Sequence, residues 1–324
     1  MTTSKIAAGS GSWVQWNPAS VGDDVPLAES IDLVHELFED PTVRVLDTAN
    51  NYGFGASEER IGMAIREYGI VPDGFTIQTK ADRDMTTGDF SGARVRRSLD
   101  ESRTRLGFDR LPVVYLHDPE NISWEQAFAA DGPVAALVAA REAGIIGTLG
   151  VAGGPPDLMR RYLDTGLFEA LITHNRYTLA DRSADRLLDH AHALGVHVTN
   201  ASPYGGGFLT AWPPPTERYA YGPAAPSVRR TAEQTAALCT AAGVPLIAAA
   251  LAFSTEDPRI DRTIIGMRTV DDLRATRELL EVTVDDELLD ALRGLDSDPR
   301  GWQDPPADRP SAPPQPRMAT PRRQ

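Results

Sequence analysis

The sequence predicts an α/β protein that folds as a single-domain (β/α)8 TIM barrel with a proline-rich C-terminal tail. The first observation is a recurrence of short, apolar, β-branched runs, which is typical of parallel strands buried on both faces. The second is that stretches with helical spacing of apolar residues separate these runs, so that strand and helix alternate. The third is the count, because eight such runs close a barrel rather than leave an open sheet.

The expected strands share a short length, an apolar character and a bias toward β-branched residues. In chain order they are Lys5–Gly9, Arg44–Asp47, Phe75–Lys80, Val113–His117, Gly147–Val151, Ala170–Asn175, His197–Ala201 and Thr263–Gly266. Apolar residues recur with helical spacing between them, as in Ile31–Phe38, Ile61–Ile65 and Leu187–Leu194. Residues suited to helix N-termini, such as Ser57 and Asp157, often precede these stretches.

An open, doubly wound sheet is the alternative architecture. It requires a glycine-rich fingerprint between its first strand and first helix. The segment Gly9–Trp13 carries two glycines but lacks the third, and Trp16, Asn17 and Pro18 follow it. The sequence therefore favours the closed barrel.

Length and composition fit one large globular domain. The chain has 324 residues, of which 41% are hydrophobic and 24% charged, so a sizeable core can be buried. We expect the barrel over residues 1–303. Residues 304–324 are rich in proline and poor in apolar side chains, so burial cannot offset the entropy of ordering them, and we expect a disordered tail.

Charge and cysteine content narrow the classes of partner. The chain has 32 basic and 46 acidic residues, a formal net charge of -14, which disfavours nucleic acid and anionic membranes. The N-terminal segment has no continuous apolar stretch, which indicates a cytoplasmic protein. Cys239 is the single cysteine, and no histidine has ligand spacing to carboxylates, so no disulfide and no metal are expected. A monomer and a small homo-oligomer are equally compatible with the sequence.

Three consecutive strands are expected to end on titratable residues, namely Asp47, Lys80 and His117, and the loop after the second strand carries Tyr52. Each residue type is more often structural when it occurs singly. Barrel active sites, however, lie at the carboxyl ends of the strands, so these four side chains should share a pocket. The sequence therefore predicts a site for acid–base chemistry.

Each of these residues has a chemical role. A phenol titrates near pH 10 in isolation, and a neighbouring ammonium such as Lys80 should lower the pKa of Tyr52. Asp47 would keep a buried Lys80 charged. His117 could hydrogen-bond the substrate oxygen and orient it toward Tyr52, which would act as the general acid or base.

Three segments resemble a known family. Asp47–Gly53 is followed by Ser57-Glu58 and Ile61-Gly62, while Thr79-Lys80 and Leu116-His117 occupy the expected strand ends. Together they resemble the aldo-keto reductase superfamily, up to about Gly294. The resemblance implies a metal-free, NAD(P)-dependent oxidoreductase whose catalytic tetrad maps onto Asp47, Tyr52, Lys80 and His117.

The resemblance also implies a cofactor site. Ser202–Leu209 is similar to the loop that wraps the pyrophosphate, where glycines let backbone amides approach the anion. Ile265–Arg268 is similar to the segment that holds the adenosine ribose. The implied cofactor-binding residues are His174, Ser202, Pro203, Tyr204, Gly205, Gly207, Leu209, Gly266, Met267, Arg268 and Asp272.

Several positions depart from the family pattern. Ala152-Gly153 replaces a common Ser-Asn pair, His174 replaces a glutamine, and Ala201 replaces a tyrosine that often stacks on nicotinamide. Asp272 occupies a position where many relatives have an arginine, and a carboxylate would repel the 2′-phosphate of NADP. Arg268 and Arg274 partly offset this repulsion, so the cofactor is NAD or NADP, with a slight preference for NAD.

The branch of D-threo-aldose (L-fucose) 1-dehydrogenases is the most similar, judging by Asp47–Gly53, Asn200–Gly207 and Arg218–Tyr221. It implies oxidation of an aldose such as L-fucose at C1 to the lactone. Trp13, Trp16 and Trp212 would then be apolar walls for a sugar that meets Tyr52 and His117, although core or rim packing explains the three tryptophans equally well. The glycine- and proline-rich loop 204–227 is expected to cover a bound cofactor or substrate.

Two other functions use the same residues. One is an NADPH-dependent reductase of small aldehydes or ketones. The other is a non-catalytic regulatory subunit that binds nicotinamide, although such a subunit has no need of Lys80 paired to Asp47. In each case the expected partner is a small molecule.

Overall fold

A computed structural model describes residues 4–15 and 23–305 and confirms the barrel. Eight parallel strands close in the order β1-β10-β7-β6-β5-β4-β3-β2. They are β1 Ile6–Gly9, β2 Val43–Asp47, β3 Thr76–Ala81, β4 Leu111–His117, β5 Ile146–Gly153, β6 Ala170–His174, β7 His197–Ala201 and β10 Arg262–Gly266. Every predicted strand is present, and its ends coincide with the prediction or differ from it by at most two residues.

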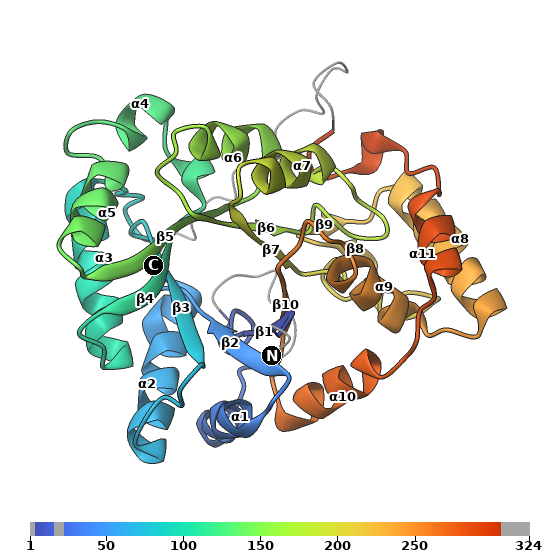
Figure 1. Cartoon of the computed structure of the whole chain (residues 1–324), viewed down its shortest axis with the longest axis horizontal. Helices are drawn as coiled ribbons and strands as arrows, with labels where there is room; N and C mark the ends of the chain where they lie inside the picture. Colours follow the sequence, from blue (N-terminus) through green and yellow to red (C-terminus); the bar gives the residue numbers. More distant parts are fainter. Residues whose placement is uncertain (1–3, 16–22, 306–324) are drawn as a thin grey trace, which may run out of the picture.

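Helices form a ring around the strands (Figure 1). They are α1 Leu27–Glu39, α2 Ala56–Tyr68, α3 Gly92–Leu106, α4 Trp124–Ala127, α5 Pro133–Glu142, α6 Pro156–Leu163, α7 Asp185–Ala193, α8 Pro226–Ala242, α9 Leu246–Thr255, α10 Val270–Leu280 and α11 Asp286–Arg293. The buried stripe of α1, Leu33, Val34 and Leu37, shows how helical spacing turns one face toward the sheet. Across the described ranges, no single helix is long and apolar enough to cross a bilayer; α8 and α9 pass that test only together and bend by 101°.

Two cores stabilise the barrel. The larger one lies between strands and helices, whereas the smaller one fills the barrel interior with residues such as Val45, Tyr115 and Ile264. Because side chains alternate along a strand, the residues two positions away also face inward. This alternation points Asp47 and Arg262 into the barrel, near its carboxyl and amino ends respectively.

The long loop 204–227 is partly folded. It contains a short antiparallel hairpin made of β8 Arg218–Tyr219 and β9 Gly222–Pro223. The Ala220 amide donates to the Gly205 carbonyl at 3.0 Å, and the buried Tyr219 hydroxyl lies 2.7 Å from Thr178 Oγ1. The hairpin therefore packs onto the glycine run, and its expected role as a cover stays a prediction.

The predicted tail begins with an anchored residue. Arg176 Nε donates to the carboxylate of Asp304 at 2.5 Å, so the tail expected from residue 304 is held at its first position. From residue 306 onward the predicted tail lies outside the described residues.

Candidate active site

Four of the predicted catalytic side chains meet at the carboxyl ends of β2, β3 and β4. Lys80 Nζ lies 2.7 Å from Asp47 Oδ2 and 3.1 Å from Tyr52 Oη, and it also donates to the Thr48 carbonyl at 2.8 Å. These three acceptors use all three hydrogens of the ammonium. The rings of Tyr52 and His117 lie 5.8 Å apart, edge to face, so the phenol and the imidazole border the same space.

Local backbone conformation presents the Tyr52 ring to Lys80. The 3-10 turn η1, Tyr52–Gly55, is left-handed at Gly53, Phe54 and Gly55, with φ of 60°, 56° and 101°. A Cβ on Gly53 would lie 2.7 Å from Val14 Cβ, so this position needs glycine for space as well as for conformation. The turn is thus dictated by the glycines that follow the tyrosine.

Glu58 stabilises the loop that carries Tyr52. It is fully buried, accepts a hydrogen bond from Thr79 Oγ1 at 2.6 Å and pairs with Arg105 at 3.1 Å. Arg105 also donates to the Asn50 carbonyl at 3.2 Å, in the loop that leads to Tyr52. The Ser57-Glu58 motif therefore supports the site through packing and hydrogen bonds.

Burial changes the expected acidity of the phenol. It raises the pKa of Tyr52 to about 12, and the Lys80 ammonium, which lowers this pKa, only partly offsets it. This corrects the expectation that Lys80 brings the phenol pKa below its ordinary value. Burial also acts to lower the pKa of Lys80, but the Asp47 carboxylate and the Tyr52 phenol outweigh it and raise that pKa. At neutral pH the lysine is charged and the phenol carries its proton.

Asp82 orients His117, a role that the sequence analysis did not assign. Its Oδ1 lies 2.6 Å from His117 Nδ1, and its Oδ2 accepts the Asn51 amide at 2.9 Å. Burial acts to lower the pKa of His117, but Asp82 and Asp118 outweigh it and raise that pKa. With Nδ1 held by Asp82, Nε2 is the imidazole nitrogen left for a substrate oxygen. The sequence does contain a signal for this role: Asp82 follows Lys80 by two residues, and side chains two positions apart along a strand point to the same side.

Carboxylates also gather next to His117. Asp118 Oδ1 lies 3.7 Å from His117 Nε2, and one ligand atom each of Asp118, Glu120 and His174 lies within 4.8 Å of the others. Burial and the Arg176 charge lower the pKa of His174 to about 4, so this imidazole is neutral. Spacing along the sequence could not reveal this cluster, because Asp118 and Glu120 follow β4 whereas His174 ends β6, and the fold brings them together.

The residues expected to bind a cofactor all end or follow β6, β7 or β10 at the same end of the barrel. Ser202, Gly205, Gly206 and Gly207 have left-handed φ values of 60°, 57°, 72° and 93°. A Cβ on Gly207 would meet no atom within 4 Å, so its backbone has open space in front of it. The Gly205 and Gly207 amides already donate to the carbonyls of Ser202 and Tyr204, so an anion would be bound by other amides of this stretch.

Two buried polar atoms near this stretch lack partners. Within the part of the chain that the structure describes, Tyr204 Oη and Asn175 Oδ1 make no hydrogen bond. Buried polar atoms normally form hydrogen bonds, so both atoms are available to hydrogen-bond a polar ligand. Together with the glycine run, they fit a cofactor that carries phosphate and amide groups.

The segment after β10 shows how its charged residues are used. Asp272 Oδ2 accepts the backbone amides of Arg268 at 2.7 Å and Thr269 at 3.1 Å, and so caps α10. The Arg268 guanidinium donates to the carbonyls of Ser12 and Asp23. Met267 and Leu209 are fully buried, so their side chains contribute packing.

Trp13 does not line a substrate site. It is 0% exposed, and its indole nitrogen donates to the Met267 carbonyl at 2.6 Å. This corrects its expected role as an apolar wall and supports the alternative of core packing. Trp16, another expected wall, lies outside the described residues.

Comparison with known proteins gives a consistent family. The family model described as "Aldo/keto reductase family" matches residues 6–297. The chain is 28% identical over 279 residues to L-galactose dehydrogenase from Arabidopsis thaliana, covering 83% of this chain and 85% of that protein. It is 28% identical over 253 residues to D-threo-aldose 1-dehydrogenase from a Pseudomonas species, covering 70% and 76%. It is 25% identical over 300 residues to pyridoxal 4-dehydrogenase from Microbacterium luteolum, covering 81% and 86%.

Solved structures share the fold. The aldo-keto reductase AKR11C1 from Bacillus halodurans superposes with a TM-score of 0.71 at 19% identity, covering 89% of this chain and 91% of that chain. The glycerol dehydrogenase AKR11B4 from Gluconobacter oxydans gives a TM-score of 0.68 at 19% identity, covering 89% and 90%.

Proposed function

The chain belongs to the aldo/keto reductase family, and from this premise we propose that it oxidises an aldose such as L-fucose or another D-threo-aldose at C1 to the lactone. The observation that carries the proposal is the contact of Lys80 Nζ with both Asp47 and Tyr52 Oη, at 2.7 and 3.1 Å. A phenol that faces a buried ammonium can exchange a proton with a substrate hydroxyl.

Each side chain has one task in this proposal. Tyr52 Oη takes the proton of the anomeric hydroxyl during oxidation and returns a proton to a carbonyl oxygen during reduction. Lys80 stabilises the phenolate through its hydrogen bond, and Asp47 keeps Lys80 charged. His117 donates from Nε2 to the same substrate oxygen and holds it near Tyr52. A nicotinamide cofactor, when bound, supplies the hydride acceptor.

The polar groups beside His117 support a sugar as substrate. Asp118 and Glu120 offer carboxylate oxygens that can accept hydrogen bonds from several hydroxyl groups, and neutral His174 adds a further partner. Their negative charge also disfavours anionic substrates. Two of the relatives, L-galactose dehydrogenase and D-threo-aldose 1-dehydrogenase, are named for sugars.

The residues proposed to hold the cofactor are His174 at the end of β6, those of the loop after β7, and those at and after the end of β10. Ser202, Pro203, Tyr204, Gly205, Gly207 and Leu209 would surround the pyrophosphate, and Gly266, Met267, Arg268 and Asp272 the adenosine ribose. Because the Asp272 carboxylate stands at this end of α10 and Arg268 already donates to two carbonyls, we propose NAD over NADP.

The test is an assay of the pure protein with L-fucose, D-arabinose and L-galactose, each with NAD⁺ and with NADP⁺. The expected result is reduction of at least one cofactor with at least one sugar. No cofactor reduction with any combination would reject an aldose as the substrate.

Reduction of small aldehydes or ketones with NADPH is the second candidate. It is favoured by the pKa of about 12 for Tyr52, which leaves a protonated phenol ready to donate to a carbonyl. Rates in both directions between pH 6 and 10 separate the two: oxidation that needs a phenolate should accelerate with pH, whereas reduction should not. Faster turnover of simple aldehydes than of sugars at neutral pH would favour the reductase.

A binding subunit without catalysis makes the opposite prediction for Tyr52→Phe. Activity that collapses while cofactor affinity persists supports catalysis by the phenol. If the wild type binds cofactor but turns over no substrate, and Tyr52→Phe behaves in the same way, the regulatory role is supported instead.

A further inference from the structure

A cavity lies at the end of the barrel opposite the tetrad. It has a volume of about 640 Å³ and is lined by residues at or near the starts of the strands, among them Thr76 of β3, His197 of β7 and Arg262 of β10. This volume falls within the range of about 300 to 1,000 Å³ that is usual for small-molecule sites. None of the residues assigned to the tetrad or the cofactor lines it.

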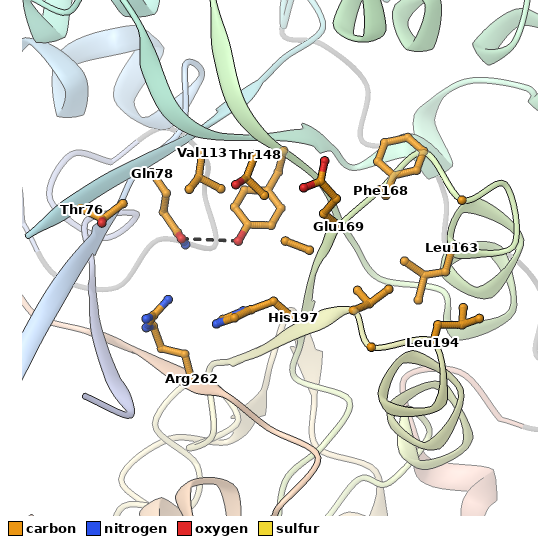
Figure 2. A pocket seen from close by; sticks show the side chains of 15 residues that line it. Thr76, Gln78, Val113, Thr148, Leu163, Phe168, Glu169, Leu194, His197 and Arg262 are labelled. Carbon is orange, nitrogen blue, oxygen red and sulfur yellow. Dashed lines mark hydrogen bonds between the residues drawn. The ribbon is translucent and has the colours of Figure 1, made fainter. Parts of the chain in front are cut away.

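The cavity has a polar and an apolar end. Figure 2 shows Arg262, Gln78 and Thr76 toward one side and Leu163, Leu194 and Phe168 toward the other, with His197 between them. An apolar pocket with a few converging polar groups is the usual form of a ligand site.

Arg262 has no hydrogen-bonded or ion-paired partner within the described ranges 4–15 and 23–305, although the charge of Asp261 acts on it. Its Nε is buried and makes no hydrogen bond, and its guanidinium takes part in no ion pair. Several other arginines that are largely removed from solvent are bonded to a carboxylate, whereas Arg182 is bonded to the backbone carbonyls of Leu292 and Arg293. The pairs with a carboxylate are Arg94–Glu101, Arg105–Glu58, Arg176–Asp304 and Arg259–Asp257.

A half-buried guanidinium that is bonded to no carboxylate is unfavourable, because it cannot lose its proton and has lost part of its hydration. The acidic residue that lines the same cavity, Glu169, is 57% exposed and bonded to Arg141 at 3.0 Å. His197 contributes no charge, since burial lowers its pKa. Asp261 acts on the Arg262 charge without being bonded to it, so within the described residues the guanidinium at the polar end keeps its hydrogen-bond donors for a ligand.

We propose that this cavity binds a small organic anion, whose oxyanion head pairs with Arg262 and whose apolar body lies among Leu163, Phe168 and Leu194. A planar guanidinium suits a carboxylate or a phosphate monoester, both of which can accept two parallel hydrogen bonds. The hydroxyl groups of Thr76 and Thr148 line the same space and can bond the remaining oxygens. The site does not depend on the proposed reaction.

Titration calorimetry on the full chain tests the proposal with acetate, butanoate, hexanoate, hexyl phosphate and the uncharged hexanamide. Affinity should rise about fourfold for each buried CH₂ from acetate to hexanoate. Hexanamide should bind at least about tenfold more weakly than hexanoate, because its amide oxygen accepts a hydrogen bond from Arg262 without the charge that strengthens it. The hexyl phosphate arm shows which of the two head groups is preferred.

Variants localise the binding. Arg262→Gln should weaken hexanoate at least about tenfold, whereas Arg300→Gln, which changes a 68% exposed guanidinium outside the cavity, should leave it unchanged. Leu194 is 50% exposed, so Leu194→Asp should fold and should weaken hexanoate more than acetate. This second variant decides the question if Arg262→Gln does not fold.

The proposal is overturned if the wild type binds none of these anions at millimolar concentration, or binds hexanamide as well as hexanoate. It is also overturned if both cavity variants bind hexanoate like the wild type, which would place the anion elsewhere on the molecule.

Discussion

Replacing Lys80 with methionine would remove the ammonium that lies 2.7 Å from Asp47 and 3.1 Å from Tyr52, with little change in side-chain volume. The hydrogen bond to the phenol is worth about 1.5 to 3 kcal/mol when one partner is charged. The variant should therefore lose about 10- to 150-fold in kcat/KM, since each 1.4 kcal/mol is a factor of ten. The loss should appear in kcat, because the interaction strengthens as the phenolate forms.

The same change should destabilise the fold. Asp47 would stay buried without its counter-charge, and breaking a buried ion pair from one side costs about 3 to 5 kcal/mol. Gln78 Nε2 still donates to Asp47 Oδ1 at 2.8 Å, so we expect the lower end, about 3 kcal/mol. Urea unfolding measures this free energy, and a steady-state assay with the preferred sugar measures kcat/KM.

The double variant Asp47→Asn/Lys80→Met separates the two effects. It removes both charges, so it should recover most of the free energy of unfolding lost by Lys80→Met alone. Activity should not recover, because no ammonium then faces Tyr52. If the double variant regained wild-type kcat/KM, Lys80 would serve only to neutralise Asp47, and the reasoning about the phenol would be refuted.

Three further predictions concern the neighbours of the tetrad. The pKa of His117 is raised in the folded protein, so its pairing with Asp82 stabilises the fold below about pH 6.5, and this stabilisation is lost as pH rises through the folded value. Asp82→Asn should therefore flatten the dependence of Tm on pH in that window. An equal slope of Tm against pH in the wild type and in Asp82→Asn would contradict the role of Asp82. Glu120→Gln should raise the ratio of kcat/KM for D-galacturonate to that for D-galactose about fivefold. The reason is that it removes a repulsion between two carboxylates, which is about 1 kcal/mol at 4 Å in water. An unchanged ratio would mean that substrates do not approach this carboxylate. Gln78→Leu should lower the free energy of unfolding by about 2 kcal/mol, measured in urea, because Asp47 Oδ1 loses its donor, and wild-type stability would show that water replaces the amide.

The barrel was predictable because buried parallel strands leave a strong signal in the sequence. All eight runs lie where the pattern placed them. The ends were less certain, as in β5, which continues through Ala152 and Gly153 although neither residue favours a strand. The hairpin of β8 and β9 carried no such pattern, because contacts with Gly205 and Thr178 hold it rather than its own residues.

The site was predictable only where residues end a strand. Asp47 and His117 end β2 and β4, Lys80 is the last but one residue of β3, and these strands are neighbours in the sheet. Asp118 and His174 follow or end strands that are separated by β5, so their approach depends on the tertiary arrangement. Trp13 illustrates the opposite error, since an aromatic residue near a site can still belong to the core.

The acidity of Tyr52 shows why residue identity does not determine electrostatics. The charge of Lys80 does lower the phenol pKa, as its chemistry requires, but the same packing that brings the two groups to 3.1 Å removes the water that would solvate a phenolate. The desolvation is the larger effect, and the pKa of Tyr52 rises to about 12. A protonated phenol is prepared to donate to a carbonyl, whereas abstraction of a sugar proton needs a further positive charge near the ring. Any such charge must come with what binds beside Tyr52, so the direction of the reaction is set jointly by the buried tetrad and its ligands.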